Sequence, residues 1–330
     1  MTELEASRIV EELRNLDIGT VREDEPLRRH TSFKIGGPAR VFVEPDSQSG
    51  VVAVLQWVRD HEVPYFIIGQ GTNVLISDQG LNAVVISTSR GLKSIAVDPP
   101  CLRAGSGVLL TKLSNTAAKA GLSGLEFAIS IPGTLGGALV MNAGAHGSSM
   151  VAVVKRVTVW DPVHGVREIA AKEAEFEYRQ SRFQKTPWIA LDATLELEPR
   201  DFAAIRELMT HHMEYRLRSQ PVGEANAGSM FKNPLPHYAG QLIERIGAKG
   251  WHENDAEVSM LHANFIINRG SARAIDVLRL MRRIRCAVFG DAGVILRPEV
   301  RWIGPGEGGT NTSWDNLWYE EGAGLKAPCE

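Results

Sequence analysis

The chain has 330 residues, of which 44% are hydrophobic, and its formal net charge at pH 7 is −3. A chain of this length has room for two or three domains, and a near-neutral charge with scattered basic residues does not indicate a nucleic-acid-binding or membrane-surface protein. The three cysteines (Cys101, Cys286 and Cys329) stand far apart, which argues against a disulfide framework and a thiolate zinc site and fits a reducing cytoplasm. No apolar run is long enough to cross a membrane, and the acidic N-terminus is unlike a signal peptide.

The first part of the sequence predicts an alternation of helices and strands. Thr2 and Glu5 have the spacing of a capping box, and the helix that follows has one apolar face, formed by Ala6, Ile9, Leu13 and Leu16. The other elements expected here are a strand over 39–43, a helix that buries Val51, Leu55 and Val58, a buried strand before Gly69, strands over 83–87 and 94–97, and a helix over 109–120 that ends at Gly121.

The second part predicts strands first and then mainly helices. Strands over 151–160, 166–170 and 188–197 are expected to be antiparallel, with a turn at 161–165. Asp201 is placed to cap a helix that carries Phe202, Ile205, Leu208 and Met209. The remaining elements expected are a helix around 242–246, a strand over 264–268, a helix over 271–289 ended by Gly290, a last strand over 293–303, and a mobile, glycine-rich acidic tail over 304–330.

Two glycine-rich segments are candidate ligand sites. The turn Gly69-Gln70-Gly71-Thr72-Asn73 directly follows a strand, but Val74 stands where a dinucleotide fingerprint has its third glycine, and residues 77–80 interrupt the helix that such a fingerprint requires. The segment 121–147 combines many glycines with otherwise apolar residues. Backbone N–H groups at such turns bind phosphates, so we interpret these segments as a phosphate cradle of another type. Ordinary turns between core elements are the alternative for the second segment.

Three polar residues lie in settings that suit catalysis but also have ordinary explanations. Arg179, with basic neighbours, is a candidate for binding a carboxylate or phosphate, or it is a solvated surface residue. Ser229, in a glycine turn, is a candidate proton donor or a simple turn hydroxyl. Glu299, on the expected last strand, is a candidate acid with a raised pKa, or the partner of the arginine two positions before it. The histidines are isolated or, at 211 and 212, adjacent on a helix and about 100° apart, so we expect no metal site.

Eight segments occur in the order found in a known enzyme family. They are HTSFKIGGPA, IIGQGTNVLISDQG, GLEFAISIPGTLGGALVMNAGAHG, EYRQSRF, QPVGEANAGSMFKNP, GQLIERIGAKG, VSMLHANFIIN and LRPEV. Together they resemble the family of UDP-N-acetylenolpyruvoylglucosamine reductases (MurB, UDP-N-acetylmuramate dehydrogenases) over roughly residues 26–303. Because only fifty positions (229 − 179) separate Arg179 from Ser229, the sequence resembles the shorter subclass, which lacks a tyrosine-bearing insertion.

The resemblance implies an α+β fold and a redox function. The fold would be an FAD-binding fold of the vanillyl-alcohol-oxidase (PCMH) type in two subdomains, 1–90 and 91–200, followed by a C-terminal α+β substrate-binding domain over 201–303. Non-covalent FAD, NADPH as co-substrate and the small-molecule substrate UDP-N-acetylglucosamine enolpyruvate are implied. So is a monomeric, cytoplasmic enzyme of peptidoglycan precursor synthesis, with no nucleic acid partner and no membrane insertion.

The resemblance also implies roles for particular residues. Hydride would pass from NADPH to FAD and then to the enolpyruvyl methylene, while Arg179 and Glu299 stabilise the enolate and Ser229 donates the proton. The implied FAD contacts are Gly69, Gln70, Gly71, Thr72, Asn73, Ile131, Pro132, Gly133, Thr134, Gly136, Gly137, Asn142, Ala143 and Gly144. The implied substrate contacts are Arg218, Gln220, Lys232, Asn233, Gln241 and Glu244.

Two departures and two alternative functions accompany this prediction. Thr72 stands where the family more often has serine, and Asn254-Asp255 stands where a glycine pair is expected, which leaves the conformation of that loop open. One alternative is another oxidoreductase of the same flavin fold that acts on an alcohol or sugar lactone. Its covalent flavin tether would have to be His61, whose helical context argues against it. The other alternative is a non-catalytic nucleotide-sugar-binding protein.

Overall fold

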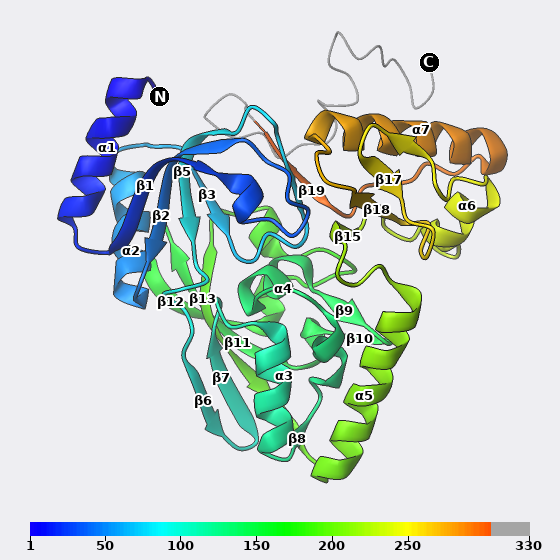
Figure 1. Cartoon of the computed structure of the whole chain (residues 1–330). Coiled ribbons are helices and arrows are strands. Elements are labelled where there is room, and N and C mark those ends of the chain that lie inside the picture. The colour runs from blue at the N-terminus through cyan, green and yellow to red at the C-terminus, as the bar shows by residue number, and fades with distance from the viewer. Residues whose placement is uncertain (305–330) are drawn as a thin grey trace. The chain divides into compact units, whose positions relative to one another are not determined.

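The computed structural model describes residues 1–304, which divide into two compact units (Figure 1). The first unit comprises residues 1–23, 41–70 and 84–218. The second comprises residues 24–40, 71–83 and those from 219 onward. Each unit is therefore built from segments that are distant in the sequence.

The N-terminal part of the first unit packs two helices and a sheet around one core. The sheet has the order β1-β2-β5-β3, and its strands are β1 (Gly19–Pro26), β2 (Pro38–Pro45), β5 (Leu81–Ser87) and β3 (Tyr65–Ile68). Helices α1 (Glu3–Asn15) and α2 (Gln48–Asp60) place their apolar residues in the same buried cluster as β2 and β5. Strand β3 runs parallel to β5 and is half-buried, and the turn that begins at Gly69 directly follows its carboxyl end.

The rest of the first unit is a five-stranded antiparallel sheet covered by helices. Its order is β12-β11-β13-β7-β6, formed by β12 (Gly165–Ala170), β11 (Val154–Asp161), β13 (Ile189–Glu196), β7 (Cys101–Gly105) and β6 (Ile95–Asp98). Helices α3 (Leu110–Lys119) and α4 (Leu135–Met141) share its core, and α5 (Phe202–Ser219) packs on a smaller cluster with Ala118 and Ile129. The short elements are β8 (Leu122–Ser123), η2 (Glu126–Ser130), β9 (Gly144–Ala145), β10 (Ser148–Ser149), η3 (Met150–Ala152), η4 (Ala171–Ala174), η5 (Arg182–Gln184) and β14 (Glu198–Pro199).

The second unit has its own sheet, helices and core. The antiparallel sheet has the order β15-β18-β17-β16, formed by β15 (Ala225–Ser229), β18 (Phe265–Asn268), β17 (Ala256–Val258) and β16 (His252–Glu253). A separate parallel pair joins β4 (Val74–Ile76) to β19 (Arg301–Ile303). The other elements are η1 (Leu27–Arg29), α6 (Ala239–Arg245) and α7 (Ala274–Ala292). Helix α7 buries Val277, Leu280, Met281 and Ile284 in this core.

Most of the expected elements are present. The capping box at Thr2 and Glu5 forms, since the Thr2 backbone N–H donates to the Glu5 carboxylate at 2.6 Å and the Glu5 N–H donates to the Thr2 hydroxyl at 3.3 Å. The three strands expected after the glycine-rich segment are β11, β12 and β13, paired antiparallel. Asp201 caps α5, because its carboxylate accepts from the Ala204 N–H at 3.1 Å.

Two helix faces differ from the prediction. In α1 the buried residues are Ala6, Val10 and Leu13, whereas Leu16 is 41% exposed. Leu16 follows the last helical turn as the C-cap residue, so it leaves the direction of the apolar face. In α5, Phe202 is 50% exposed because it occupies the first helical position, ahead of the turn that packs Ile205.

The C-terminal segment differs more. Gly290 does not end α7, which continues to Ala292 and ends at Gly293, a left-handed residue with φ of +66°. The expected last strand over 293–303 is reduced to β19, and Glu299 lies before it in an extended segment that makes a single bridge, between Phe231 and Pro298. The expected mobile tail lies outside the described residues, apart from Gly304.

The loop at Asn254-Asp255 is well defined by hydrogen bonds. Asn254 adopts a left-handed conformation with φ of +47°, which suits asparagine, and its side chain donates to Asp276 at 2.8 Å. The Asp255 carboxylate accepts from the N–H and hydroxyl of Ser271, at 2.9 and 2.7 Å. These two residues therefore turn the chain between β16 and β17 without the expected glycine pair.

Candidate active site

The two predicted faces of the phosphate cradle meet within the first unit. A Cβ on Gly69 would lie 2.5 Å from the Thr134 hydroxyl oxygen, so only glycine allows this approach. That hydroxyl caps α4 by accepting from the Gly137 N–H. A Cβ on Gly136 would lie 2.9 Å from the Cβ of Ser106, whose buried hydroxyl has no hydrogen-bond partner within residues 1–304. Gly69 thus allows close packing on the Thr134 hydroxyl, and Gly136 allows close packing on Ser106.

Arg179 lies at the tip of a tight turn in the same unit. Glu177 and Gln180 bridge across the turn through two backbone hydrogen bonds of 3.0 and 3.2 Å. Arg179 has φ of +55°, a left-handed conformation that costs a non-glycine residue free energy. Its guanidinium Nη2 donates to the Gly144 carbonyl at 2.9 Å. The turn therefore aims a strained arginine at one of the predicted FAD contacts.

Asn142 connects this turn to α4. It ends α4 in a left-handed conformation with φ of +40°. Its amide Nδ2 donates to the Glu177 carbonyl at 2.9 Å, and its Oδ1 accepts from the Val151 N–H at 3.0 Å. Within the first unit, the structure brings together Arg179 and the predicted FAD contacts Asn142 and Gly144.

Ser229 and Glu299 are brought together within the second unit. Ser229 ends β15 and is paired with Phe265. The next residue, Met230, accepts a hydrogen bond through its carbonyl from the Glu299 N–H at 2.8 Å. Seventy positions apart in the sequence, the hydroxyl-bearing and carboxyl-bearing residues thus lie on adjacent, hydrogen-bonded segments.

Asn73 lies beside this pair. Its side-chain Nδ2 donates to the Glu299 carbonyl at 3.3 Å, and its own carbonyl accepts from the Arg301 N–H at 3.0 Å. Gly71, two residues earlier, has φ of +58°, and a Cβ there would lie 2.2 Å from the His30 carbonyl oxygen. The second half of the predicted FAD turn is therefore fixed against the segment that carries Glu299.

The predicted substrate contacts have varied surroundings. The Asn233 side chain caps α6 by accepting from the Ala239 N–H at 3.0 Å, and the Lys232 N–H donates to the Arg297 carbonyl at 2.8 Å. Glu244 forms an ion pair with Lys249 at 2.5 Å. The others are Gln220 just after α5, Gln241 exposed on α6, and Arg218, which is exposed in the last turn of α5 and belongs to the first unit.

Sequence reasoning missed a buried group on α5. Arg216 donates from Nη1 to the Ser130 carbonyl, its Nε is buried without a partner within residues 1–304, and burial lowers the pKa of its guanidinium. His212, one turn earlier, stacks on His146 with ring centroids 3.8 Å apart. Burial, and then the nearby histidines, lower the pKa of both imidazoles. The i, i+4 spacing places His212 and Arg216 on one face of the helix, but the sequence does not show that this face is buried.

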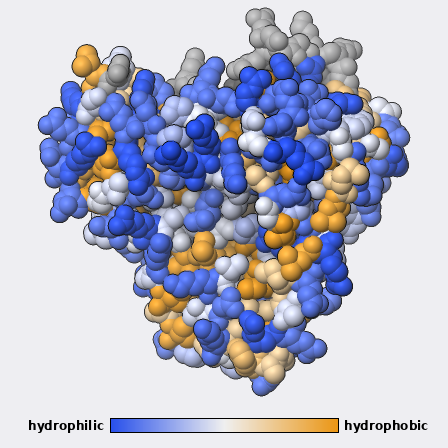
Figure 2. Space-filling view, viewed as in Figure 1, coloured by the Kyte–Doolittle hydropathy of each residue, from blue (hydrophilic) through white to orange (hydrophobic). Residues whose placement is uncertain are grey.

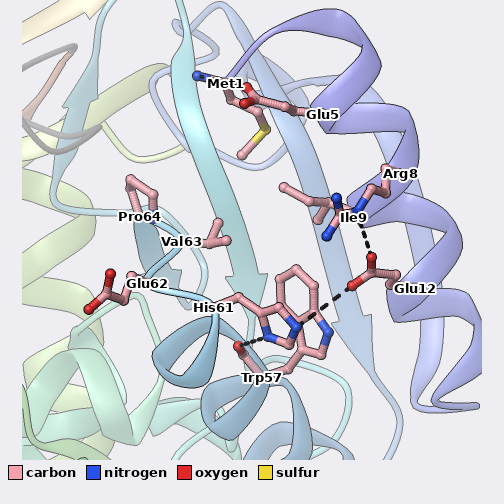
Figure 3. A pocket seen from close by; sticks show the side chains of 10 residues that line it. All are labelled: Met1, Glu5, Arg8, Ile9, Glu12, Trp57, His61, Glu62, Val63 and Pro64. Atoms are coloured by element: carbon pink, nitrogen blue, oxygen red, sulfur yellow. Dashed lines mark hydrogen bonds and ion pairs between the residues drawn. The ribbon is translucent and has the colours of Figure 1, made fainter.

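A separate hollow of about 310 Å³ in the first unit lies between α1 and the end of α2 (Figure 3). In it His61 stacks on Trp57 and its Nε2 lies 3.8 Å from a Glu12 carboxylate oxygen. None of the predicted site residues lines this hollow. Figure 2 shows a largely hydrophilic face with scattered hydrophobic residues. Leu235 and Tyr238, close in sequence to the predicted substrate contacts, have exposed apolar side chains.

Comparisons with known proteins identify the family. A model of the UDP-N-acetylenolpyruvoylglucosamine reductase C-terminal domain matches residues 220–303, and an FAD-binding domain model matches residues 39–168. A UDP-N-acetylenolpyruvoylglucosamine reductase of Anoxybacillus flavithermus is 43% identical over 298 residues, which cover 90% of this chain and 99% of that protein. The chain belongs to the UDP-N-acetylenolpyruvoylglucosamine reductase family.

Other members of this family agree. The Bacillus subtilis reductase is 38% identical over 298 residues, covering 90% of this chain and 98% of the relative. The crystal structure of the Thermus caldophilus member superimposes with a TM-score of 0.71 at 33% identity, covering 86% of this chain and 98% of that one. The resemblance and the predicted fold class are confirmed: the chain is an FAD-dependent oxidoreductase with a PCMH-type FAD-binding fold and a C-terminal domain. No helix within residues 1–304 is long and apolar enough to cross a membrane.

Proposed function

We propose that this chain catalyses the NADPH-dependent, FAD-mediated reduction of UDP-N-acetylglucosamine enolpyruvate to UDP-N-acetylmuramate, in the cytoplasm, as a step in peptidoglycan precursor synthesis. Family membership supports the reaction. The observation that carries the proposal is the pairing of the Ser229 and Glu299 segments through the hydrogen bond from the Glu299 N–H to the Met230 carbonyl. Reduction of an enolpyruvyl double bond needs a proton donor and a group that stabilises the developing enolate, and these are the two side chains on the paired segments.

The residues around the two glycine turns fit FAD. The approach of Gly69 to Thr134 excludes any larger side chain, and the unsatisfied Ser106 hydroxyl borders Gly136. In the first unit, Gly69, Gln70 and the residues 131–137 would bind the diphosphate, with Asn142, Ala143 and Gly144 beside Arg179. Phosphate binding at bare backbone turns is a general use of such sequences.

Bound FAD would supply the redox chemistry, as the hydride carrier between NADPH and the methylene carbon of the substrate. As that carbon gains the hydride, negative charge moves into the substrate carboxylate. Arg179 would stabilise this charge as a fixed cation, and Glu299 would do so as a protonated acid that donates a hydrogen bond. Ser229 would transfer its hydroxyl proton to the carbon next to the carboxylate, which completes the addition of a hydride and a proton across the double bond.

Anaerobic half-reaction kinetics test this proposal. Removal of the Ser229 hydroxyl in Ser229→Ala should leave flavin bleaching by NADPH unchanged and slow the return of colour with UDP-N-acetylglucosamine enolpyruvate by about 10²–10⁴-fold, the usual size of a general-acid contribution. Ser271→Ala is the matched control, because its hydroxyl bonds to Asp255 in the same unit. Equal losses in both half-reactions of Ser229→Ala would refute the role of Ser229. The alternative oxidoreductase would be favoured if the reduced wild-type protein regained its colour with the oxidised form of an alcohol or with a sugar lactone, but not with the enolpyruvyl substrate.

A further inference from the structure

Asn264 clamps the residue that lies two positions after Ser229. Its amide Nδ2 donates to the Phe231 carbonyl at 2.8 Å, and its Oδ1 accepts from the Phe231 N–H at 3.0 Å. Its own carbonyl accepts from the Met230 N–H at 2.9 Å. Asn264 is 4% exposed and Phe231 is 1% exposed, so water does not compete for these bonds. One side chain thus satisfies both backbone groups of a single buried residue.

The opposite edge of the same segment holds Glu299. The Met230 carbonyl accepts from the Glu299 N–H and the Lys232 N–H donates to the Arg297 carbonyl, both at 2.8 Å. Phe231 and Pro298 form the bridge between these bonds. Residues 230–232 therefore lie between Asn264 on one edge and the Glu299 segment on the other.

The backbone ladder does not secure this arrangement alone. The pairing of β15 with β18 is irregular between Asn226 and Ser229, where Gly228 adopts φ of +76°. After this irregularity, the backbone N–H and carbonyl of Phe231 bond to the side chain of Asn264 and not to the backbone of a neighbouring strand. Asn264 is itself held, because its N–H donates to the His262 Nδ1 at 3.2 Å.

We propose that Asn264 is a positioning residue that fixes the register of Ser229 against Glu299 through its two hydrogen bonds to Phe231. The catalytic importance of this register rests on the proposed function, whereas the hydrogen bonds from Asn264 to Phe231 do not depend on it. Without the amide, residues 230–232 lose their anchor on one edge, and Ser229 shifts relative to Glu299. A misplacement of about 1 Å can cost about 10²-fold in rate.

The test compares two asparagines four positions apart. Asn268, the last residue of β18, is also buried, and it donates to the Phe33 carbonyl at 3.0 Å and accepts from the N–H groups of Gly270 and Ala272. Asn264→Ala should bleach normally with NADPH but regain colour with the enolpyruvyl substrate about 10²-fold more slowly. Asn268→Ala, which disrupts a comparable set of bonds elsewhere, should keep both half-reactions within about twofold. Equal effects of the two variants on the second half-reaction would overturn the proposal.

A second variant separates positioning from loss of folding. In Asn264→Asp the side chain keeps its shape and can still accept from the Phe231 N–H. When the carboxyl is ionised, its second oxygen faces the Phe231 carbonyl and the two acceptors repel each other. When the carboxyl is protonated, its O–H can donate to that carbonyl, as the amide does. Burial raises the pKa of such a carboxyl, so the second half-reaction should recover toward the wild-type rate as the pH falls. A variant profile parallel to that of the wild type would overturn the proposal.

Amide hydrogen exchange tests the clamp without reference to the reaction. In Asn264→Ala, exchange should accelerate at residues 230–232 and at Glu299, while in Asn268→Ala it should accelerate at 270–272 instead. Unchanged exchange at 230–232 in Asn264→Ala would overturn the clamp even if activity fell. Accelerated exchange in that variant, together with a wild-type enzyme that ignores the enolpyruvyl substrate, would support the clamp and refute the proposed function.

Discussion

The strained backbone of Arg179 allows its functional role to be tested apart from its structural one. A left-handed conformation costs a non-glycine residue about 1–2 kcal/mol, and glycine avoids this cost. Glycine also raises the conformational entropy of the unfolded chain, which lowers the free energy of unfolding by about 0.4–1 kcal/mol relative to alanine. Both Arg179→Ala and Arg179→Gly lose the hydrogen bond to the Gly144 carbonyl, so this loss cancels between them. The glycine variant should therefore be more stable than the alanine variant by about 0.5–1 kcal/mol.

Thermal unfolding and half-reaction kinetics of both variants measure these effects. The stability difference corresponds to about 1–4 °C in midpoint temperature for a unit of this size. Both variants should bleach with NADPH and lose most of the second half-reaction, because neither has the guanidinium. Glu175, with φ of +46° and an exposed side chain, provides the control pair: its glycine variant should also exceed its alanine variant in stability, with full activity in both. An alanine variant of Arg179 that is more stable than the glycine variant, or one that turns over normally, would refute the reasoning.

Three further predictions concern the first unit. Gly69→Ala should displace the Thr134 cap, which costs about 1 kcal/mol, and should reduce the FAD retained after gel filtration; full retention at an unchanged midpoint temperature would contradict it. Asp201→Ala should lower the unfolding free energy by about 1 kcal/mol in urea titrations, because α5 loses its cap, and should leave both half-reactions intact. Because burial lowers the pKa of His146 and His212, the unfolded state binds more protons below about pH 6.5, and stability should fall from pH 7 to pH 5. His212→Phe should flatten that decline, and an unchanged slope would count against the stacked histidines as its cause.

The sequence predicted local structure well where neighbouring residues determine it. Thr2 and Glu5 form the expected capping box, and Asp201 caps its helix, because each bond joins residues three positions apart. The end of α7 was not predicted because Gly290 and Gly293 are equally suitable from composition. Gly290 continues as an exposed helical residue, while Gly293 takes the left-handed conformation. Which glycine ends the helix depends on tertiary packing, which local sequence does not describe.

The site shows the same division between local and long-range information. Ser229 and Glu299 were chosen from their own neighbourhoods, and the shared hydrogen bond through Met230 joins segments seventy positions apart. Asn264 was not singled out, because an asparagine before a strand carries no signal of its own. Its importance lies in a partner, Phe231, that is 33 positions away.

Asn73 shows how one short turn can belong to two parts of a mechanism. The chain passes from the first unit to the second between Gln70 and Gly71. Gly69, before that point, packs on Thr134 at the predicted cofactor cradle, whereas Asn73, after it, holds the Glu299 carbonyl with its side chain and the Arg301 N–H with its own carbonyl. Only three residues separate Gly69 from Asn73, so the backbone that would contact FAD is continuous with the backbone that positions the proposed acid. A substitution that displaces the backbone at Gly69 can therefore also displace Asn73, because the two residues are joined by only a few peptide bonds.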